Sequence, residues 1–279
     1  MRKGEMSMGV PENKPKHPFW KPFFALFLLG ALGVLSLILN TMPQIEQLGE
    51  LSPELAEMPV QVLIALQLLQ SVVLVLIATA GGCLLAPRVG LVSFIYEKAA
   101  YGKPVLSRLK PQLLLAFALG LIFAVVAIVL DLAFVPFMGE EFLAIEAWGV
   151  NLFAQLGLGI LYGGITEELL LRWGFMSFLV WLGWLLLRRS GSHPPGGLVW
   201  TAIILSAILF GIGHLPAMAT LVPLNAIIVM RTVLLNAIGG VVFGWLYWRR
   251  SLESAMVAHA STHVGFFIAS LLAMAFNLG

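Results

Sequence analysis

The chain has 279 residues, of which 60% are hydrophobic and only 11% are charged, and its mean hydropathy is +0.97. Soluble globular proteins carry roughly 25% charged residues, so this composition excludes a soluble protein and indicates one that crosses the membrane several times. The net charge of +2 gives no indication of a nucleic-acid partner. The basic residues instead predict how the chain is oriented in the lipid bilayer.

Three apolar segments in the first half are each long enough to cross a bilayer, which takes about 20 residues. They lie at 22–39, 60–85 and 112–135. The tail before the first segment and the loop between the second and third are basic, whereas the other two loops are acidic. Because basic loops stay in the cytoplasm, we expect residues 1–21 to be a cytoplasmic tail and residues 22–147 to contain three spans.

Residues 148–187 form a longer apolar segment that has two interpretations. A single α-helix of this length would be about 60 Å long, twice the thickness of the hydrocarbon core. Gly163 and Gly164 predict a break, so the segment is either a partial helix followed by one span or two full spans.

Three more spans are predicted after a Gly- and Pro-rich turn at 191–197. They lie at 198–215, 232–248 and 254–276, and the short apolar stretch 217–230 is interpreted as re-entrant. In lipid every backbone polar group must be satisfied internally. The sequence therefore predicts an all-α, polytopic transmembrane bundle of seven or eight helices.

Glu167, Glu168 and Arg172 lie inside the apolar segment 148–187. A charge at the centre of a bilayer costs at least about 2.5–3.5 kcal/mol on insertion scales, so three within six positions need a compensating interaction. Residues four apart share a helix face, so Glu168 is predicted to pair with Arg172 as a structural clamp. Glu167 is turned about 100° away and faces another part of the bundle.

Three histidines lie in apolar segments of the same half. His259 and His263 are spaced i, i+4 and share a face, and Phe210 has the same spacing to His214, which it is expected to hold by packing. One intramembrane histidine is typical of a helix–helix contact. Three histidines with an unpaired glutamate indicate acid–base chemistry or a metal site instead.

Other polar residues at membrane depth are weaker candidates. Asn225 and Asn236 fit a structural role as well as a functional one, and Asp131, near the end of the third span, is interpreted as interfacial and structural. The single cysteine, Cys83, cannot form an internal disulfide.

Two kinds of site fit these residues. In the first, Glu167 and His214 deprotonate a water molecule, and His259 and His263 donate hydrogen bonds to the oxyanion. In the second, His214, His259 and His263 hold Zn²⁺ and Glu167 activates the bound water. The sequence contains no His-Glu-x-x-His zinc helix, no Gly-x-Ser-Gly nucleophile motif and no pair of intramembrane aspartates.

Three motifs, in this order, resemble the CPBP family of type II CAAX prenyl proteases and bacterial Abi or bacteriocin-immunity membrane proteins. They are Glu-Glu-x-x-x-Arg at 167–172, Phe-x-x-x-His at 210–214 and His-x-x-x-His at 259–263. The segment 239–260 is also similar to the family's approach to its third motif. The resemblance covers about residues 148–270, and we expect 148–279 to be the catalytic core.

The resemblance implies a glutamate-dependent intramembrane endopeptidase that needs no metal, so no cofactor is expected. It implies that Glu167 is the general base and acts with His214, that Glu168 and Arg172 brace it, and that His259 contributes to the oxyanion site.

His263 stands where family members commonly carry Asn. A neutral imidazole donates one hydrogen bond, unlike an amide NH₂. The difference therefore either preserves the oxyanion role or permits metal binding.

The leading interpretation is a hydrolase of the cell membrane that cleaves a peptide or a membrane protein, with its N-terminus in the cytoplasm. CAAX cleavage is the family's best-known activity, but no prenyl-binding site can be identified in the sequence. The alternatives are a non-catalytic immunity or scaffold protein, a zinc-dependent membrane protease, and a transporter with a Glu/His relay. The absence of internal repeats disfavours a transporter.

Overall fold

The computed structural model describes residues 18–40, 58–139, 151–187 and 191–276. Within these ranges the chain forms helices and no strands, which confirms the predicted all-α fold. The helices of the first half are α1 (Trp20–Leu35), α4 (Val60–Leu85), α5 (Phe94–Tyr101) and α6 (Leu106–Phe134). Those of the second half are α8 (Leu152–Leu158), α9 (Ser177–Leu186), α10 (Gly196–Gly213), α11 (Leu215–Ala219), α12 (Ala226–Arg249) and α13 (Leu252–Phe276).

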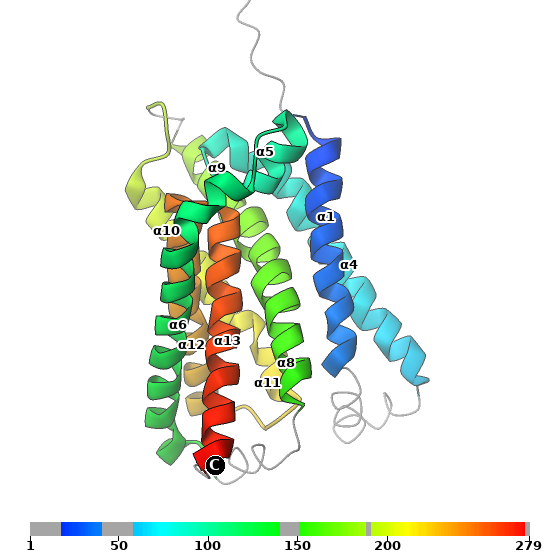
Figure 1. Ribbon diagram of the computed structural model, residues 1–279, viewed down its shortest axis with the longest axis vertical. Coiled ribbons are helices and arrows are strands. Elements are labelled where there is room, and N and C mark those ends of the chain that lie inside the picture. The colour runs from blue at the N-terminus through cyan, green and yellow to red at the C-terminus, as the bar shows by residue number, and fades with distance from the viewer. Residues whose placement is uncertain (1–17, 41–57, 140–150, 188–190, 277–279) are drawn as a thin grey trace, which may run out of the picture.

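Seven helical segments in the described part of the chain are long and apolar enough to cross a membrane. They run alternately up and down the bundle, with α1 and α4 on one side and α6, α10, α12 and α13 on the other (Figure 1). The outward side chains include many large apolar residues, among them Leu28, Ile77, Leu114 and Val129, as expected for a surface in contact with lipid.

The segment from Leu152 to Leu186 is a single crossing of 35 residues. It contains two π-helical stretches, η4 (Gly159–Glu167) and η5 (Leu169–Met176), between α8 and α9. The predicted break at Gly163 and Gly164 is therefore wrong. A Cβ on Gly164 would lie 2.9 Å from the Cβ of Ala260 in α13, so this glycine permits close helix packing and does not end the helix.

Residues 217–230 do not form a re-entrant segment. α11 ends at Ala219, and α12 begins at Ala226, six residues before the predicted start of that span. Asn225 caps α12, because its Oδ1 accepts a hydrogen bond of 2.9 Å from the backbone N–H of Ile228. This contact gives Asn225 a structural role, as expected of a helix N-cap.

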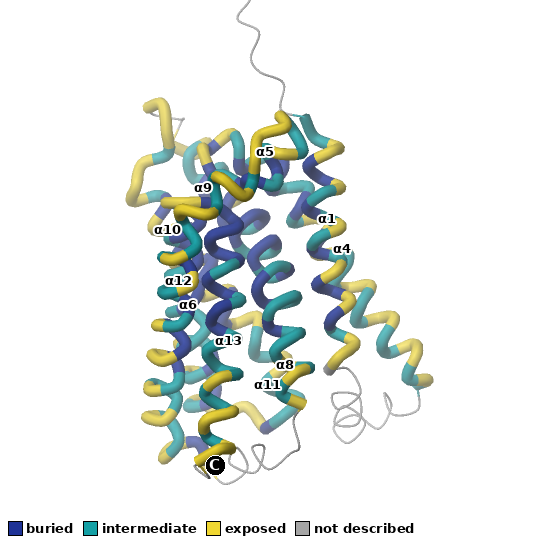
Figure 2. Tube along the Cα trace, viewed as in Figure 1, coloured by how far each residue is buried: buried dark blue, intermediate teal, exposed yellow. Residues whose placement is uncertain are grey.

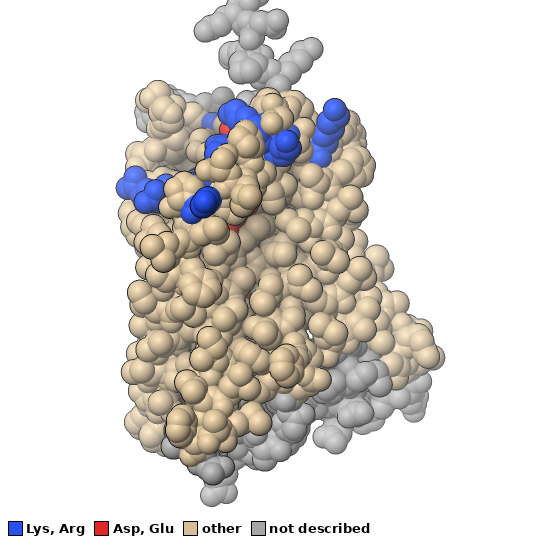
Figure 3. All heavy atoms as spheres, in the orientation of Figure 1, with Lys and Arg blue, Asp and Glu red and all other residues tan. Residues whose placement is uncertain are grey.

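The buried part of the bundle lies between its middle and one end (Figure 2). Trp173, Leu169 and Met176 of η5 and Tyr247 and Leu246 of α12 are all fully buried there. The same end carries the basic side chains that Figure 3 shows gathered around α5. They come from η2 (Ala86–Val89), α5, the start of α6 and the end of α12: Arg88, Lys98, Lys103, Arg108, Lys110, Arg249 and Arg250. We call this end of the molecule the basic end.

Candidate active site

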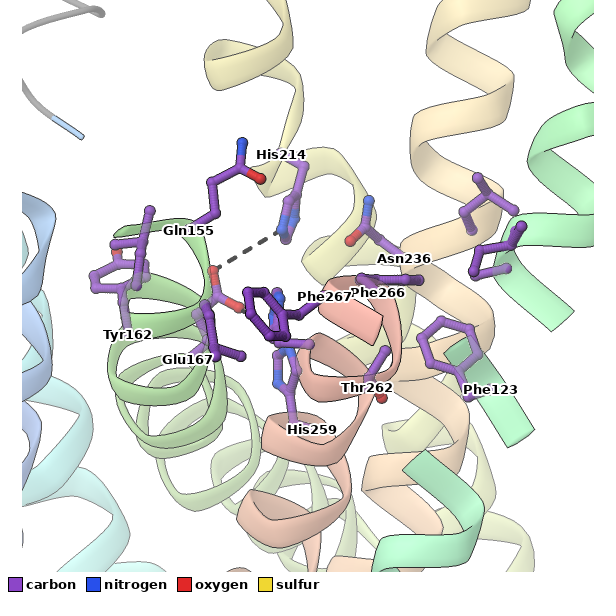
Figure 4. A pocket seen from close by; sticks show the side chains of 18 of the residues that line it. Phe123, Gln155, Tyr162, Glu167, His214, Asn236, His259, Thr262, Phe266 and Phe267 are labelled. Atoms are coloured by element: carbon purple, nitrogen blue, oxygen red, sulfur yellow. Dashed lines mark ion pairs between the residues drawn. The ribbon is translucent and has the colours of Figure 1, made fainter. Parts of the chain in front are cut away.

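Glu167 lies at the end of η4, and its carboxylate faces two histidine rings from other helices (Figure 4). Its Oε1 lies 3.9 Å from Nε2 of His214, and its Oε2 lies 3.7 Å from Nε2 of His259. Both distances exceed a hydrogen bond. Both gaps are short enough for one water molecule to bridge the carboxylate and the ring, as a general base requires.

The π-helical backbone helps to aim Glu167. A π-helix forms i→i+5 hydrogen bonds. Residues five apart, such as Tyr162 and Glu167, therefore lie close to one face, whereas in an α-helix they would be about 140° apart. Both side chains line the same two cavities. Tyr162 was not among the predicted site residues, because α-helical periodicity places it on another face than Glu167.

Glu168 is fully buried and has two partners. Its Oε2 lies 3.3 Å from Nε of Arg172, as the i, i+4 spacing predicted. Its Oε1 lies 2.9 Å from Nδ1 of His259, which the sequence did not predict. The Arg172 guanidinium also donates a 3.1 Å hydrogen bond to the carbonyl oxygen of Gly240 and lies 4.9 Å from the centre of the Phe210 ring.

These contacts fix which nitrogens of the two histidines carry hydrogen. In His214, Nδ1 donates to the carbonyl oxygen of Phe210 at 2.8 Å, because a carbonyl oxygen can only accept. In His259, Nδ1 donates to the Glu168 carboxylate for the same reason. In the neutral rings, both Nε2 atoms therefore present a lone pair towards Glu167.

Phe210 packs edge-on against both of these rings, with centroid distances of 4.7 Å to His214 and 5.7 Å to His259. Phe210 thus contacts His214 at the predicted i, i+4 spacing. His263 stacks on His259 at 5.3 Å and lines the same cavity. Gly159 makes room for it, since a Cβ on Gly159 would lie 2.3 Å from the His263 ring.

A cavity of about 570 Å³ adjoins Glu167 between α6, the segment Leu152–Glu167, α12 and α13. Its polar lining includes Asn236, a weaker candidate from the sequence, and Asp131, which was expected to be interfacial. The other polar lining residues were not predicted: Gln155, Tyr162, Arg231, Thr262 and Ser270.

Asp131 and Arg231 form an ion pair in this lining, with Nε–Oδ1 and Nη2–Oδ2 distances of 2.5 and 2.8 Å. Asp131 was interpreted as interfacial and structural, and the pair does join α6 to α12. Its place in the cavity wall was not predicted. The sequence did contain an indication of this pair, because each of the two apolar segments carries one charge and the two charges have opposite sign.

A second cavity, of about 560 Å³, lies on the other side of Glu167 and has a mostly apolar wall. α4 contributes Leu74, Ile77 and Gly81 to it, η5 contributes Leu170 and Phe175, and α10 contributes Leu209. Four residues line both cavities: Tyr162, Glu167, Phe210 and His214. Glu167 and His214 thus stand where the two cavities meet.

The alternative zinc site receives no support from the arrangement of side chains. Among the described residues, no group of three or more His, Cys, Asp or Glu side chains is arranged to hold a metal ion.

A half-buried carboxylate between two imidazoles, in an apolar span and beside two cavities, is an arrangement that suits acid–base chemistry. The family model described as type II CAAX prenyl endopeptidase Rce1-like matches residues 149–265. The match confirms the resemblance that the three motifs indicated, so the C-terminal part of the chain is CAAX-protease-like. Comparison with curated proteins and with solved structures finds no match for the chain.

Proposed function

We propose that the protein hydrolyses peptide bonds within the membrane through a water molecule shared by Glu167 and His214. The observation that carries the proposal is the gap of 3.9 Å between Oε1 of Glu167 and Nε2 of His214. A water molecule in this gap can donate one hydrogen to the carboxylate and the other to the ring lone pair. Each contact would orient an oxygen lone pair towards the cavity.

The proposed reaction begins when Glu167 takes a proton from this water and the water oxygen attacks the scissile carbonyl carbon. The carbonyl π electrons move to oxygen and form the tetrahedral oxyanion. The proton then passes to the amide nitrogen as the C–N bond breaks, which leaves a carboxylic acid and an amine. No metal is required for this sequence of steps.

The oxyanion needs N–H donors, and we assign them to His263 and Asn236. Both line the cavity next to Glu167. The Asn236 amide donates one hydrogen to the Thr232 carbonyl oxygen at 2.8 Å, which leaves its second N–H hydrogen for a ligand. The neutral His259 lacks a hydrogen on Nε2, so it suits a positioning role between Glu168 and Glu167 better than the implied oxyanion role.

The substrate would be a peptide or a membrane protein that reaches the site within the bilayer of the cell membrane. We further propose that the basic end faces the cytoplasm, because basic loops are retained on that side. This orientation places the N-terminal tail in the cytoplasm.

The test is cleavage of a pool of fluorescent peptides of varied sequence by purified protein in detergent. Glu167→Gln keeps the shape of the side chain and removes the base, so cleavage should fall by roughly 10²–10⁴-fold. Thermal unfolding should stay close to wild type, since Glu167 is not in the fully buried ion pair. Glu97→Gln, which changes a carboxylate in α5 outside the spans, is the matched control and should keep activity.

Three outcomes would contradict the proposal. Cleavage by the Glu167→Gln variant at the wild-type rate would show that Glu167 is not the general base. Unfolding of this variant would favour a structural role. Loss of cleavage on addition of EDTA would favour the zinc-dependent mechanism.

A further inference from the structure

The two histidines beside Glu167 differ in the group that binds their Nδ1 atoms. Nδ1 of His214 donates to the carbonyl oxygen of Phe210 at 2.8 Å, which is a neutral acceptor. Nδ1 of His259 donates at 2.9 Å to the carboxylate of Glu168, which is fully buried. A buried carboxylate at Nδ1 holds an imidazole in one tautomer and stabilises the cation that forms when Nε2 takes a proton. At this nitrogen, a protonated His259 ring therefore has a charged partner, whereas a protonated His214 ring has a neutral one.

The aromatic packing around His259 favours the same cation. The rings of Phe243 and His259 are stacked, with their centroids 4.5 Å apart and an angle of 17° between their planes. The face of an aromatic ring attracts a cation at such a distance. Phe210 and His263 also contact the His259 ring, which is buried. This packing holds Nε2 of His259 in its position 3.7 Å from Oε2 of Glu167.

The gap between Oε2 of Glu167 and Nε2 of His259 places two hydrogen-bond acceptors opposite each other. Neither an ionised carboxylate nor the lone pair of a neutral imidazole has a hydrogen to donate. The contact becomes attractive when a hydrogen lies between the two atoms, which is possible once Glu167 has taken a proton from the attacking water. The carboxyl group can turn this hydrogen from the His214 side to the His259 side about its terminal torsion, which is broad and roughly two-fold.

We propose that His259 is a catalytic residue that carries the proton from Glu167 to the leaving nitrogen, an inference that rests on the proposed function. In the first transfer, the O–H bond of Glu167 breaks and an Nε2–H bond of His259 forms, directly or through one water molecule. In the second, this N–H bond breaks and the proton binds the nitrogen of the scissile amide. The electrons of the C–N bond move to that nitrogen, and the oxyanion forms the carbonyl group again. Glu167 is then a carboxylate and His259 is neutral, as at the start.

This role also places the two ends of the reaction around Glu167. His259 lines the cavity of about 570 Å³, together with His263 and Asn236, to which we assign the oxyanion. His214 lies at the other oxygen of the carboxylate, where the attacking water is held. The leaving nitrogen would therefore lie on the His259 side and the attacking water on the His214 side. Each oxygen of one carboxylate thus serves a different step.

The experiment compares two substrates that share an acyl part and differ in the leaving group. One is a peptide of the fluorescent pool that the wild-type protein cleaves in detergent, and the other is the para-nitrophenyl ester of its acyl part. An amide nitrogen must gain a proton in order to leave, whereas para-nitrophenolate leaves as an anion. Activation of the water and formation of the oxyanion are common to both substrates. The ratio of ester to amide cleavage therefore reports on delivery of the proton alone.

The main variant is His259→Gln, whose amide can place an N–H near the position of Nε2 but cannot take up a proton and pass it on. We expect amide cleavage to fall by roughly 10²–10⁴-fold, the usual contribution of acid–base catalysis, and ester cleavage by less than about tenfold. His214→Gln is the matched comparison. It removes the ring that orients the water, so both substrates should slow to a similar degree.

A second variant, His259→Asn, is used if His259→Gln melts far below wild type. Its amide N–H can replace the Nδ1–H donor to Glu168, and it has no atom at the position of Nε2, so the ratio of ester to amide cleavage should rise as well. Equal losses for the two substrates would overturn the inference and leave the proposed function standing, because an oxyanion donor or a structural residue serves both substrates alike. Full amide cleavage by His259→Gln would also overturn it. A wild-type protein that cleaves neither substrate would contradict the proposed function, and the inference with it.

Discussion

Adjacent carboxylates have contrasting environments in this protein. Glu168 is fully buried and contacts Arg172 and His259, whereas Glu167 has 17% of its side-chain surface exposed and faces the cavities. Pairs of titratable groups in such different surroundings often divide structural and chemical roles. The division here predicts that the two glutamates respond differently to the same isosteric substitution.

We expect Glu168→Gln to destabilise the fold strongly. The change would leave the Arg172 guanidinium, which is 1% exposed, without its counter-charge in the protein interior. Breaking a buried ion pair by removing one partner costs about 3–5 kcal/mol. The melting temperature in detergent measures the effect, and Glu167→Gln is the control that should melt near wild type. Equal melting of Glu168→Gln and wild type would show that the pair is not a stabilising clamp.

The spacing of residues along one helix predicted part of the site. The Glu168–Arg172 pair and the Phe210–His214 packing follow from i, i+4 geometry. The bond between His259 and Glu168 could not be predicted, because it joins residues 91 positions apart on different helices. The Asp131–Arg231 pair was not predicted for the same reason. Helical periodicity shows which face of a helix a residue lies on, but it does not show which residue of another helix it contacts.

At the scale of helices, close approach depends on individual glycines. Gly82 in α4 faces the buried Trp173 of η5, and a Cβ there would lie 2.2 Å from the indole ring. A Cβ on its neighbour Gly81 would have no atom within 4 Å. The two positions share the same helix and the same residue type, so they form a natural pair of test and control.

We expect Gly82→Ala to destabilise the protein by about 1–3 kcal/mol through overpacking. Gly81→Ala should be neutral or stabilise it by up to about 1 kcal/mol, because alanine favours a helix over glycine. Thermal unfolding of both variants in the same detergent compares them directly. A similar loss in both would mean that helix flexibility, and not contact with Trp173, sets the cost.

The short helix α5 is held by charged and polar contacts at both of its ends. Ser93 caps it by accepting from the Tyr96 N–H at 3.1 Å, and its hydroxyl donates to Glu253 of α13 at 2.6 Å. Towards the other end, Glu97 accepts hydrogen bonds from Lys103, at 2.9 Å, and from Arg108. These contacts attach the basic end to the C-terminal half of the bundle.

The Glu97 contacts predict a pH-dependent contribution to stability. Burial alone would raise the pKa of Glu97, but the hydrogen bonds and charges of Lys103 and Arg108 outweigh it and hold the pKa below its ordinary value. A lowered pKa in the folded state means that the contribution is complete above the unfolded value and is lost as the pH falls through the folded value. Because Lys103 is half exposed, the contribution should be at most about 1 kcal/mol.

Melting temperatures of wild type and Glu97→Gln over a pH series measure this contribution. The difference between the two proteins should be largest near neutral pH and should shrink as the pH falls through the lowered pKa of Glu97, where the carboxylate becomes protonated. High salt should shrink it as well. A difference that stays constant with pH would mean that the charge of Glu97 does not stabilise α5.

The positions of most helices followed from hydropathy, whereas their internal geometry did not. The first two spans begin within two residues of the predicted positions, and the third begins at Leu106, six residues earlier than predicted. The π-helical stretches of the Leu152–Leu186 span left no recognisable pattern in the sequence. As a continuous α-helix, the predicted segment 148–187 would be longer than the bilayer is thick, so a break was expected. The observed span instead contains the two π-helical stretches and no break.

For the whole molecule, the number of crossings fixes the relative positions of its ends. The described residues contain seven candidate spans, and α1 starts at the basic end while α13 finishes at the other (Figure 1). Basic and acidic loops predicted the alternation of the first three spans. The charges of the loops could not give the direction of the later spans, because segment 148–187 could cross the membrane once or twice.

An odd number of crossings predicts that fusions at two sites behave in opposite ways. Alkaline phosphatase fused after Phe276 should be active, because it would lie outside the cytoplasm, where its disulfides can form. The same enzyme inserted after Gly102, in the loop between α5 and α6 at the basic end, should be inactive. Activity at both sites would require an even number of crossings between them and would contradict the seven-span topology. Activity only after Gly102 would keep the topology but invert the orientation.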